Sequence, residues 1–276
     1  MVRARREEHG AKESISSSLP LKRSASPDDG ARKNPSKISL SMWLASAGES
    51  TDPGQLPPPV TCAAARLEDR DSVFIGYVYP ITSASPTAIS ARLENLKHTV
   101  HPAIPPATLP PPFQHASAQR RVSTHDIYAY RVLQLKRGRS GLGGPDDFGI
   151  EQGTEDDGES WGAEKVMRVI RELGASDVMV VVSRWYGGVL LGPVRFEHIQ
   201  NVTRAALQHF LALEKLAHLR AKLQDMDRTI FTARHPGTKM NNVQEYPTLT
   251  LENAQRLLLA RTKTLEVLEK RGAGSV

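Results

Sequence analysis

The sequence predicts a domain in which strands and helices alternate, preceded by a polar segment and followed by two further helices. Three observations predict this arrangement. Residues 178–182 are five consecutive apolar residues, mostly β-branched, which is typical of a strand buried on both faces. Apolar residues recur at helical spacing after residue 193 and again over residues 251–270. Residues 1–70 are instead rich in serine, proline and charge, which is typical of disorder.

The first elements of the expected domain have clear local signals. Residues 73–79 alternate as a strand does, with Val73, Ile75, Tyr77 and Tyr79 on one face. A helix begins at Pro86, because proline suits the first helical turn and Ser85 is a good N-cap. We expect this helix to end near residue 97.

In the middle of the chain, segments rich in proline or glycine alternate with segments that are expected to form a strand or a helix. Residues 102–119 form a proline-rich insertion, which can neither continue a helix nor join a central strand. Residues 125–133 read as a second strand, and residues 138–153 as a glycine-rich loop. A helix is expected over residues 162–173, ending where Gly174 provides a C′ residue.

The C-terminal part of the chain predicts an antiparallel pair of helices. A helix opened by Pro193 keeps a leucine stripe towards Met226. A turn near Pro236 and Gly237 separates it from a second amphipathic helix over residues 251–270. The expected organisation is a disordered tail at 1–70, a mixed domain at 71–210 and a helical extension at 211–276, which offers a surface for self-association.

The overall composition describes a basic chain with a single cysteine. The net charge of +6 admits an acidic partner such as RNA or a ribosome, although much of the excess lies near the two ends. One cysteine, Cys62, excludes an intramolecular disulfide and a multi-cysteine zinc site. No apolar run approaches the roughly 18–20 residues that cross a bilayer. We therefore expect a soluble, cytoplasmic protein without a membrane segment.

One apolar stretch interrupts the polar N-terminal region, at residues 38–44, and it contains Trp43. Two interpretations stay open for this 38–44 segment. It is either a short docking motif for a partner or a segment that packs back on the folded domain.

The densest motif follows the buried strand. Two arginines and a glycine-rich turn lead into the helix that Pro193 opens, and helix N-termini attract anions through unpaired N–H groups and the helix dipole. The plain alternative is a tight turn that needs positive φ, with the aromatic residues as core anchors. The residues concerned are Arg184, Trp185, Tyr186, Gly187, Gly188 and Arg195.

An acidic loop and a histidine are the features most typical of enzymes. Asp156, Asp157 and Glu159 precede a helix, where carboxylates either hold Mg²⁺, act as an acid/base pair or cap the helix. His125 shares a strand face with Arg131 and is either a structural hydrogen-bonding residue or a catalytic one. Because no nucleophile or metal-ligand spacing is present, the sequence assigns no catalytic residue, metal or cofactor.

Three of these motifs, in this order, resemble the Impact (UPF0029) family. They are THDIYAYR from residue 124, EDDGES from residue 155, and SRWYGG from residue 183 with the following LGPVRFEHI. The resemblance extends over about residues 71–210. It implies an α+β fold similar to ribonuclease PH and to the second domain of a small-subunit ribosomal protein.

The resemblance also implies a function and a surface. Family members are associated with translational control, acting through a scaffold that activates a kinase of a translation initiation factor. In them a separate N-terminal RWD domain contacts the scaffold, and residues 1–70 do not resemble it. Asp126 stands where the family usually has asparagine, which adds negative charge beside the expected site. The site residues that the resemblance implies are His125, Arg131, Asp156, Asp157, Glu159, Arg184, Tyr186, Gly187, Gly188 and Arg195.

Three functional hypotheses follow. The first is a non-enzymatic regulator of translation or stress signalling that binds a ribosome, RNA or a regulatory protein. The second is a metal-assisted phosphoesterase or nuclease that uses Asp156, Asp157 and Glu159, with Arg184 holding phosphate. The third is a protein–protein adaptor that works through the C-terminal helices.

Overall fold

The computed structural model describes residues 52–240, 242 and 244–273. Its centre is one antiparallel sheet with strand order β1-β2-β5-β3-β4. The strands are β1 (Arg66–Asp69), β2 (Ser72–Pro80), β3 (His125–Leu135), β4 (Phe148–Glu155) and β5 (Val178–Trp185). Since β2 and β3 both pair antiparallel with β5, they run in the same direction with β5 between them. This arrangement confirms the α+β fold.

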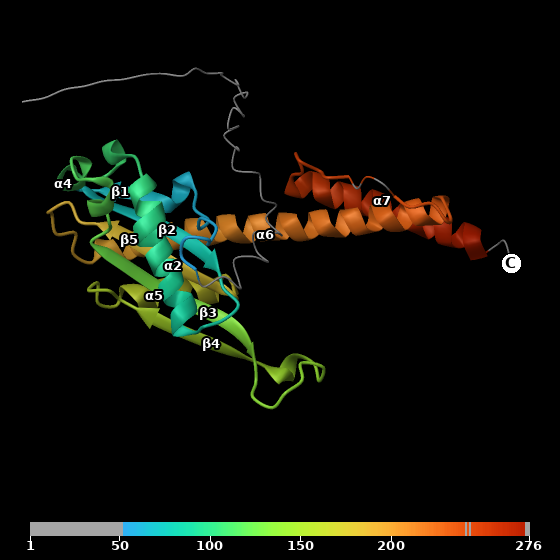
Figure 1. Cartoon of the computed structure of the whole chain (residues 1–276), viewed down its shortest axis with the longest axis horizontal. Helices are drawn as coiled ribbons and strands as arrows, with labels where there is room; N and C mark the ends of the chain where they lie inside the picture. The colour runs from blue at the N-terminus through green and yellow to red at the C-terminus, as the bar shows by residue number, and fades with distance from the viewer. Residues whose placement is uncertain (1–51, 241, 243, 274–276) are drawn as a thin grey trace, which may run out of the picture. The chain divides into compact units, whose positions relative to one another are not determined.

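Helices cover both faces of the sheet (Figure 1). The long elements are α2 (Pro86–Asn95), α5 (Gly162–Glu172), α6 (Val194–Arg234) and α7 (Leu251–Ala273). Short elements connect them: η1 (Ala63–Ala65), the π-helix η2 (Leu96–Val100), α3 (His101–Ala103), η3 (Pro106–Thr108), α4 (Pro111–Gln114), η4 (Ala118–Arg120) and η5 (Pro145–Asp147).

Strand alternation divides the interior into two apolar cores. Phe74 and Val78 of β2 face α5 and α6, together with Val180 and Val182 of β5. The neighbouring residues of β2, from Val73 to Tyr79 in steps of two, face α2 and the segment after it. The expected division of residues 73–79 between two faces is therefore confirmed. Both β2 and β5 contribute residues to the two cores, and every residue of each strand is buried.

Local sequence signals set the ends of the helices as expected. Ser85 caps α2, because its hydroxyl accepts a hydrogen bond from the Ala88 N–H at 3.3 Å. Gly174 ends α5 with φ of +65°, and Ala175 N–H donates back to the Ile170 carbonyl. Gly76 lets α6 approach β2 closely: a Cβ there would lie 2.5 Å from the Val202 carbonyl oxygen.

The α6–α7 pair confirms the expected C-terminal hairpin, with α7 alongside the distal part of α6 (Figure 1). Its interior is a separate apolar core that includes Leu223, Leu249 and Ala254. The leucine stripe of α6 is divided, because Leu207 packs against the sheet whereas Leu223 packs in the hairpin. Residue 210, the expected domain boundary, lies inside one continuous helix.

Three expectations about irregular structure need correction. Residues 66–69 form β1, and Leu56 and Ala65 are buried, so the expected disorder up to residue 70 is wrong for residues 52–70. Residues 148–155 form the edge strand β4 rather than a loop, because pairing with β3 satisfies a backbone whose side chains are mostly exposed. Ser183 and Arg184 continue β5 instead of ending it. The 38–44 segment lies outside the described residues.

Candidate functional site

Four chain segments meet at a pocket of about 310 Å³. The sheet register places His125, at the start of β3, directly opposite Arg184, near the end of β5. The acidic loop before α5 and the turn before α6 close the other sides. The pocket is lined by His125, Gly158, Glu159, Arg184, Tyr186, Leu190, Leu191 and Arg195.

A buried ion-pair cluster forms the polar wall of this pocket. Arg184 Nη1 donates to Glu159 Oε1, and only 5% of each residue is exposed. The other carboxylate oxygen of Glu159 lies 2.9 Å from Arg195 Nε. The Arg184 guanidinium also lies between the rings of Phe74 and Tyr186, at 5.2 and 5.3 Å from their centroids. One carboxylate therefore faces two guanidinium groups, and Arg195 is the more exposed of the two.

His125 is fixed by the acidic loop. Its Nδ1 lies 2.6 Å from the Asp157 carbonyl oxygen, which can only accept, so Nδ1 carries a proton. The other ring nitrogen, Nε2, lies 3.7 Å from Glu159 Oε1 and is directed to the same cluster. His125 thus connects the loop to the ion pairs.

The other two carboxylates of the acidic loop have structural partners. Asp156 accepts hydrogen bonds from the Trp161 and Ala163 N–H groups at 2.9 and 2.8 Å and so caps α5. Asp157 accepts from the Asp126 N–H at 2.6 Å. The three carboxylates therefore point at three different partners. In the part of the chain that the structure describes, no group of three His, Cys, Asp or Glu side chains is arranged to hold a metal ion.

The remaining sequence-predicted residues lie outside the pocket lining. Arg131 is six residues along β3, where its Nη1 donates to the Ala175 carbonyl at 3.0 Å. Gly187 packs against the backbone of Asp71: a Cβ there would lie 2.0 Å from its carbonyl oxygen. Gly188 has φ of +95° and provides the turn that glycine favours. For these three residues the structure gives a conformational or packing reason.

Sequence reasoning missed the apolar part of the pocket. Leu190 and Leu191 line it, and Leu190 is 83% exposed. The available signal in the sequence was the position of this leucine in a glycine-rich turn, where a leucine does not contribute to a core.

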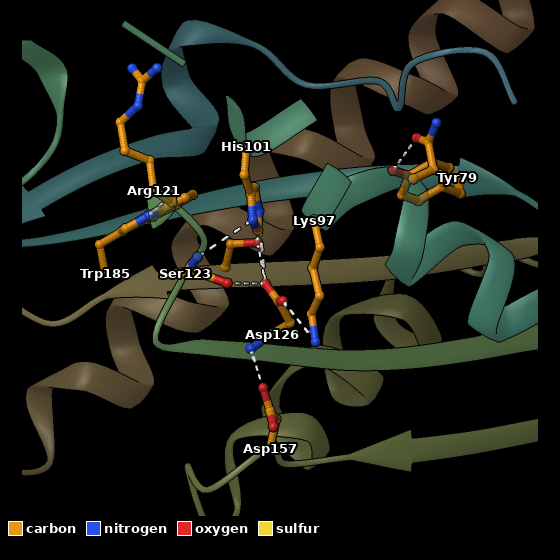
Figure 2. A network of polar contacts seen from close by, with 10 residues as sticks. Tyr79, Lys97, His101, Arg121, Ser123, Asp126, Asp157 and Trp185 are labelled. Atoms are coloured by element: carbon orange, nitrogen blue, oxygen red, sulfur yellow. Dashed lines mark hydrogen bonds and ion pairs between the residues drawn. The ribbon is translucent and has the colours of Figure 1, made fainter. Parts of the chain in front are cut away.

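Behind the pocket, on the opposite face of β3 and β5, lies a buried polar network (Figure 2). The Asp126 carboxylate accepts from the Ser123 and Ser183 hydroxyls at 2.6 and 2.7 Å. Lys97 Nζ is 3.8 Å from the same carboxylate. The expectation that Asp126 adds negative charge beside the site is therefore wrong, because strand alternation directs its side chain into the core while His125 faces the pocket.

His101 completes this network. Its Nε2 lies 3.0 Å from Ser183 Oγ, whose own proton goes to Asp126, so Nε2 is the donor. Its Nδ1 accepts from the Ser123 N–H at 3.5 Å, and its ring packs edge-on against Trp185 at 4.9 Å. Burial lowers the pKa of His101 to about 4, the nearby Asp126 opposes that shift and Lys97 adds to it. His101 is thus a neutral core histidine at physiological pH.

The sequence profile of the Impact N-terminal domain matches residues 70–207, which is half of the chain. The chain belongs to the Impact family. The matched region contains the whole pocket and the buried network behind it. Among the described residues, no helix is long and apolar enough to span a membrane.

Relatives within the Impact family cover this chain in part. Protein IMPACT of Xenopus laevis is 33% identical over 153 residues, which are 55% of this chain and 39% of that protein. Protein IMPACT of Rattus norvegicus is 32% identical over 65% of this chain and 47% of its own length. Bos taurus Protein IMPACT is 46% identical over 85 residues, or 31% of this chain and 24% of that protein. The chain thus spans less than half the length of these relatives.

Two solved structures are also similar to this chain. One, described as the two-domain translational regulator Yih1, is 23% identical and covers 71% of this chain and 54% of its own, with a TM-score of 0.29. The other, described as a hypothetical protein, is 19% identical and covers 62% and 73%, with a TM-score of 0.33.

Proposed function

We propose that this chain is a non-enzymatic regulator of translation or stress signalling. In this proposal it binds a ribosome, RNA or a translation-control protein through the surface formed by the RWYGG turn and the LGPVRF helix start. Membership of the Impact family supports the translational part, since the family resemblance implies that role. The proposal assigns no catalytic group, metal or cofactor to the site.

The observation that carries the proposal is that the pocket holds two arginines but only one glutamate. Glu159 is shared by Arg184 and Arg195, which leaves net positive charge in a partly enclosed space. The Nε of Arg184 is buried and has no hydrogen-bond partner among the described residues, whereas Arg195 is partly exposed and lines the pocket, so Arg195 is the group that an incoming anion would meet first. The exposed Leu190 beside these groups offers an apolar contact. Such a pocket suits an anionic group on a partner better than it suits bond-breaking chemistry.

The same geometry argues against catalysis by the acidic loop. Asp156 and Asp157 accept backbone hydrogen bonds, and Glu159 is neutralised by arginine. A general base or a metal ligand needs a carboxylate that is directed at the reacting group. Here each carboxylate is already directed at the protein itself.

Arg195→Glu is the sharper test of the surface, because Arg184 is buried and its replacement would also disturb folding. Lysate containing the tagged full chain would be separated on a sucrose gradient. We expect the wild type to migrate with ribosomal fractions and Arg195→Glu to remain near the top. Arg168→Glu makes the same charge change at an exposed position of α5 outside the pocket and is the matched control.

Three results decide this proposal. Loss of comigration in Arg195→Glu alone, with a salt dependence that weakens in the variant, supports an anionic ligand at the pocket. Equal loss in Arg168→Glu reduces the effect to overall charge and contradicts the site assignment. A wild type that stays at the top of the gradient contradicts a ribosome-bound role.

A second candidate function is a protein–protein adaptor that uses residues 211–276 as a separate extension. The observation that favours it is the apolar exposure of α7, where Leu259 is 60% and Val267 is 49% exposed. Partner capture that survives Arg195→Glu but is lost in Leu259→Asp/Val267→Asp would favour the adaptor. Capture that is indifferent to the α7 variant would reject it. Substitutions are preferable to a truncation after residue 210, because a truncation there would cut α6 in the middle of the helix.

A further inference from the structure

The loop that joins β3 to β4 projects beyond the end of the sheet (Figure 1). It follows the end of β3 opposite to His125, and so lies away from the pocket lined by His125 and Arg184, here called the Arg184 pocket. Ser140 lies in this loop and is exposed, as are the four residues before it. Its Oγ accepts from the Leu142 N–H at 3.3 Å, and its own proton has no acceptor among the described residues. Ser140 therefore presents an accessible hydroxyl whose proton is free to leave.

Three cations stand on the N-terminal side of this hydroxyl. Lys136, Arg137 and Arg139 occupy the positions four, three and one residues before Ser140. Arg139 Nη1 lies 3.8 Å from Asp147 Oδ1, a contact within the loop itself. Arg137 is exposed and makes no hydrogen bond or ion pair with another residue in the part of the chain that the structure describes. Its guanidinium is therefore available to an acidic group on a partner.

The loop can extend into an enzyme cleft without disturbing the sheet. Gly138, Gly141 and Gly144 have positive φ, between +78° and +100°, a conformation that glycine adopts at low cost. The loop is closed through Asp147, whose Oδ2 accepts from the Gly143 N–H at 2.8 Å. Exposed loops with few buried apolar contacts open locally at little cost in free energy, and such loops are where modifying enzymes such as proteases gain access. The fold therefore presents Ser140 on a segment that an enzyme can bind.

We propose that Ser140 is a phosphorylation site for an arginine-directed serine kinase, in which carboxylates of the substrate cleft bind guanidinium groups that precede the acceptor. Arg137 and Arg139 provide the charge recognition, since complementary charges fix the register of a bound segment. Ser140 Oγ attacks the γ-phosphorus of ATP, and the bond from that phosphorus to the β–γ bridging oxygen breaks. ADP leaves, and the hydroxyl proton passes to the aspartate of the kinase catalytic loop. This inference is independent of the anionic ligand proposed for the Arg184 pocket.

Phosphorylation would reverse the charge of the loop. Residues 136–147 hold three cations and two aspartates, so the loop carries a small positive charge. A phosphoserine adds a charge of about −1.5 to −2 at neutral pH, which makes the loop negative. The phosphate oxygens would also compete with Asp147 for the Arg139 guanidinium, because hydrogen bonds between ionised groups are strong. The modified loop would then repel an acidic surface that the unmodified loop attracts.

Ser160 is a matched comparison within the same chain. It is also exposed and lies in the loop before α5. The positions four, three and one residues before it hold the carboxylates of Asp156, Asp157 and Glu159, where Ser140 is preceded by cations. An acidic kinase cleft should therefore reject Ser160, although its hydroxyl is accessible. The two serines separate recognition by charge from exposure alone.

The full chain would be incubated with Mg²⁺, ATP and the catalytic subunit of cAMP-dependent protein kinase, and each phosphate located by mass spectrometry of peptides. We expect phosphate at Ser140 and none at Ser160. Arg137→Ala should lower kcat/KM for Ser140 at least about tenfold, because the loss of one close charge pair at an interface costs that much or more. Arg168→Ala, at an exposed position of α5, is the control and should leave the rate unchanged.

The outcomes separate clearly. Phosphate at Ser140 that depends on Arg137 but not on Arg168 supports the proposal. A chain that receives no phosphate at Ser140 overturns it, whichever other residues are modified. Equal modification of Ser160 also overturns it, because exposure alone then decides the site. A rate at Ser140 that Arg137→Ala leaves unchanged refutes recognition by arginine. Both substituted arginines are exposed, and thermal unfolding of each variant checks that the domain is intact.

Discussion

Acidification should destabilise this protein through His101. The imidazole is fully buried and neutral, with Nε2 donating to Ser183 and Nδ1 accepting from the Ser123 N–H. Protonation of Nδ1 would remove that acceptor and place a positive charge in the core. Asp126 at 3.9 Å would partly stabilise this charge, while Lys97, which faces the same carboxylate, would oppose it.

The size of the effect follows from the pKa difference. Burial lowers the pKa of His101 from 6.5 in the unfolded chain to about 4 in the folded protein. Between these values the unfolded state binds a proton that the folded state does not, so stability falls as the pH falls. The contribution is fully present above pH 6.5 and is lost as the pH approaches 4. At about 1.4 kcal/mol per pKa unit, the loss is on the order of 3 kcal/mol.

Urea unfolding of the wild type and of His101→Asn, from about pH 7 to about pH 4, measures this term. We expect the wild type to lose more stability over this range than His101→Asn, by about 3 kcal/mol, because the variant lacks the titrating group. His98→Asn is the matched control, since His98 is exposed in the same helical segment. An NMR titration that places the His101 pKa near 6.5 would refute the reasoning, whatever the unfolding data show.

Two further substitutions test the packing and the charge of the Arg184 pocket. Gly187→Ala should lower the free energy of unfolding by about 3 kcal/mol or more, because its Cβ would lie 2.0 Å from the Asp71 carbonyl oxygen. Gly149→Ala, which meets only the Lys136 side chain at 3.6 Å, should be nearly neutral, and equal effects would contradict the close approach. Glu159→Gln should cost about 3–5 kcal/mol in urea unfolding, because the buried Arg184 loses its counter-charge. A stability within about 0.5 kcal/mol of the wild type would contradict this reasoning, because it would mean that solvent already screens the charge of Arg184.

Much of the fold was predictable because its signals are local. Alternation predicted the two faces of β2, and Ser85 with Pro86 predicted the start of α2. The elements that were missed lack such signals: β4 is an edge strand with two glycines and mostly exposed side chains, so its pattern resembles a loop. β1 is four residues long, and its stability comes from pairing with β2 rather than from its own composition.

The sequence predicted which segments contribute residues to the candidate site, but not how their side chains are arranged. The motifs pointed to His125, Glu159, Arg184 and Arg195, and the structure brings these four around one pocket. The roles of the acidic residues were not predictable, since a carboxylate before a helix either caps it or faces outward. Hydrogen-bond geometry assigns Asp156 to the cap and Glu159 to the arginines.

The sequence by itself determined where the backbone turns, which faces of each element are apolar and where positive φ is needed, as at Gly174 and Gly188. These properties depend on residues a few positions apart, so they can be read along the chain. Only the tertiary structure decided that Asp126 lies in the core while His125, its neighbour, faces the pocket. It also decided that Arg184 is buried while Arg195 remains partly exposed. Those outcomes depend on sheet register and on the approach of α6, which join residues that are far apart in the sequence.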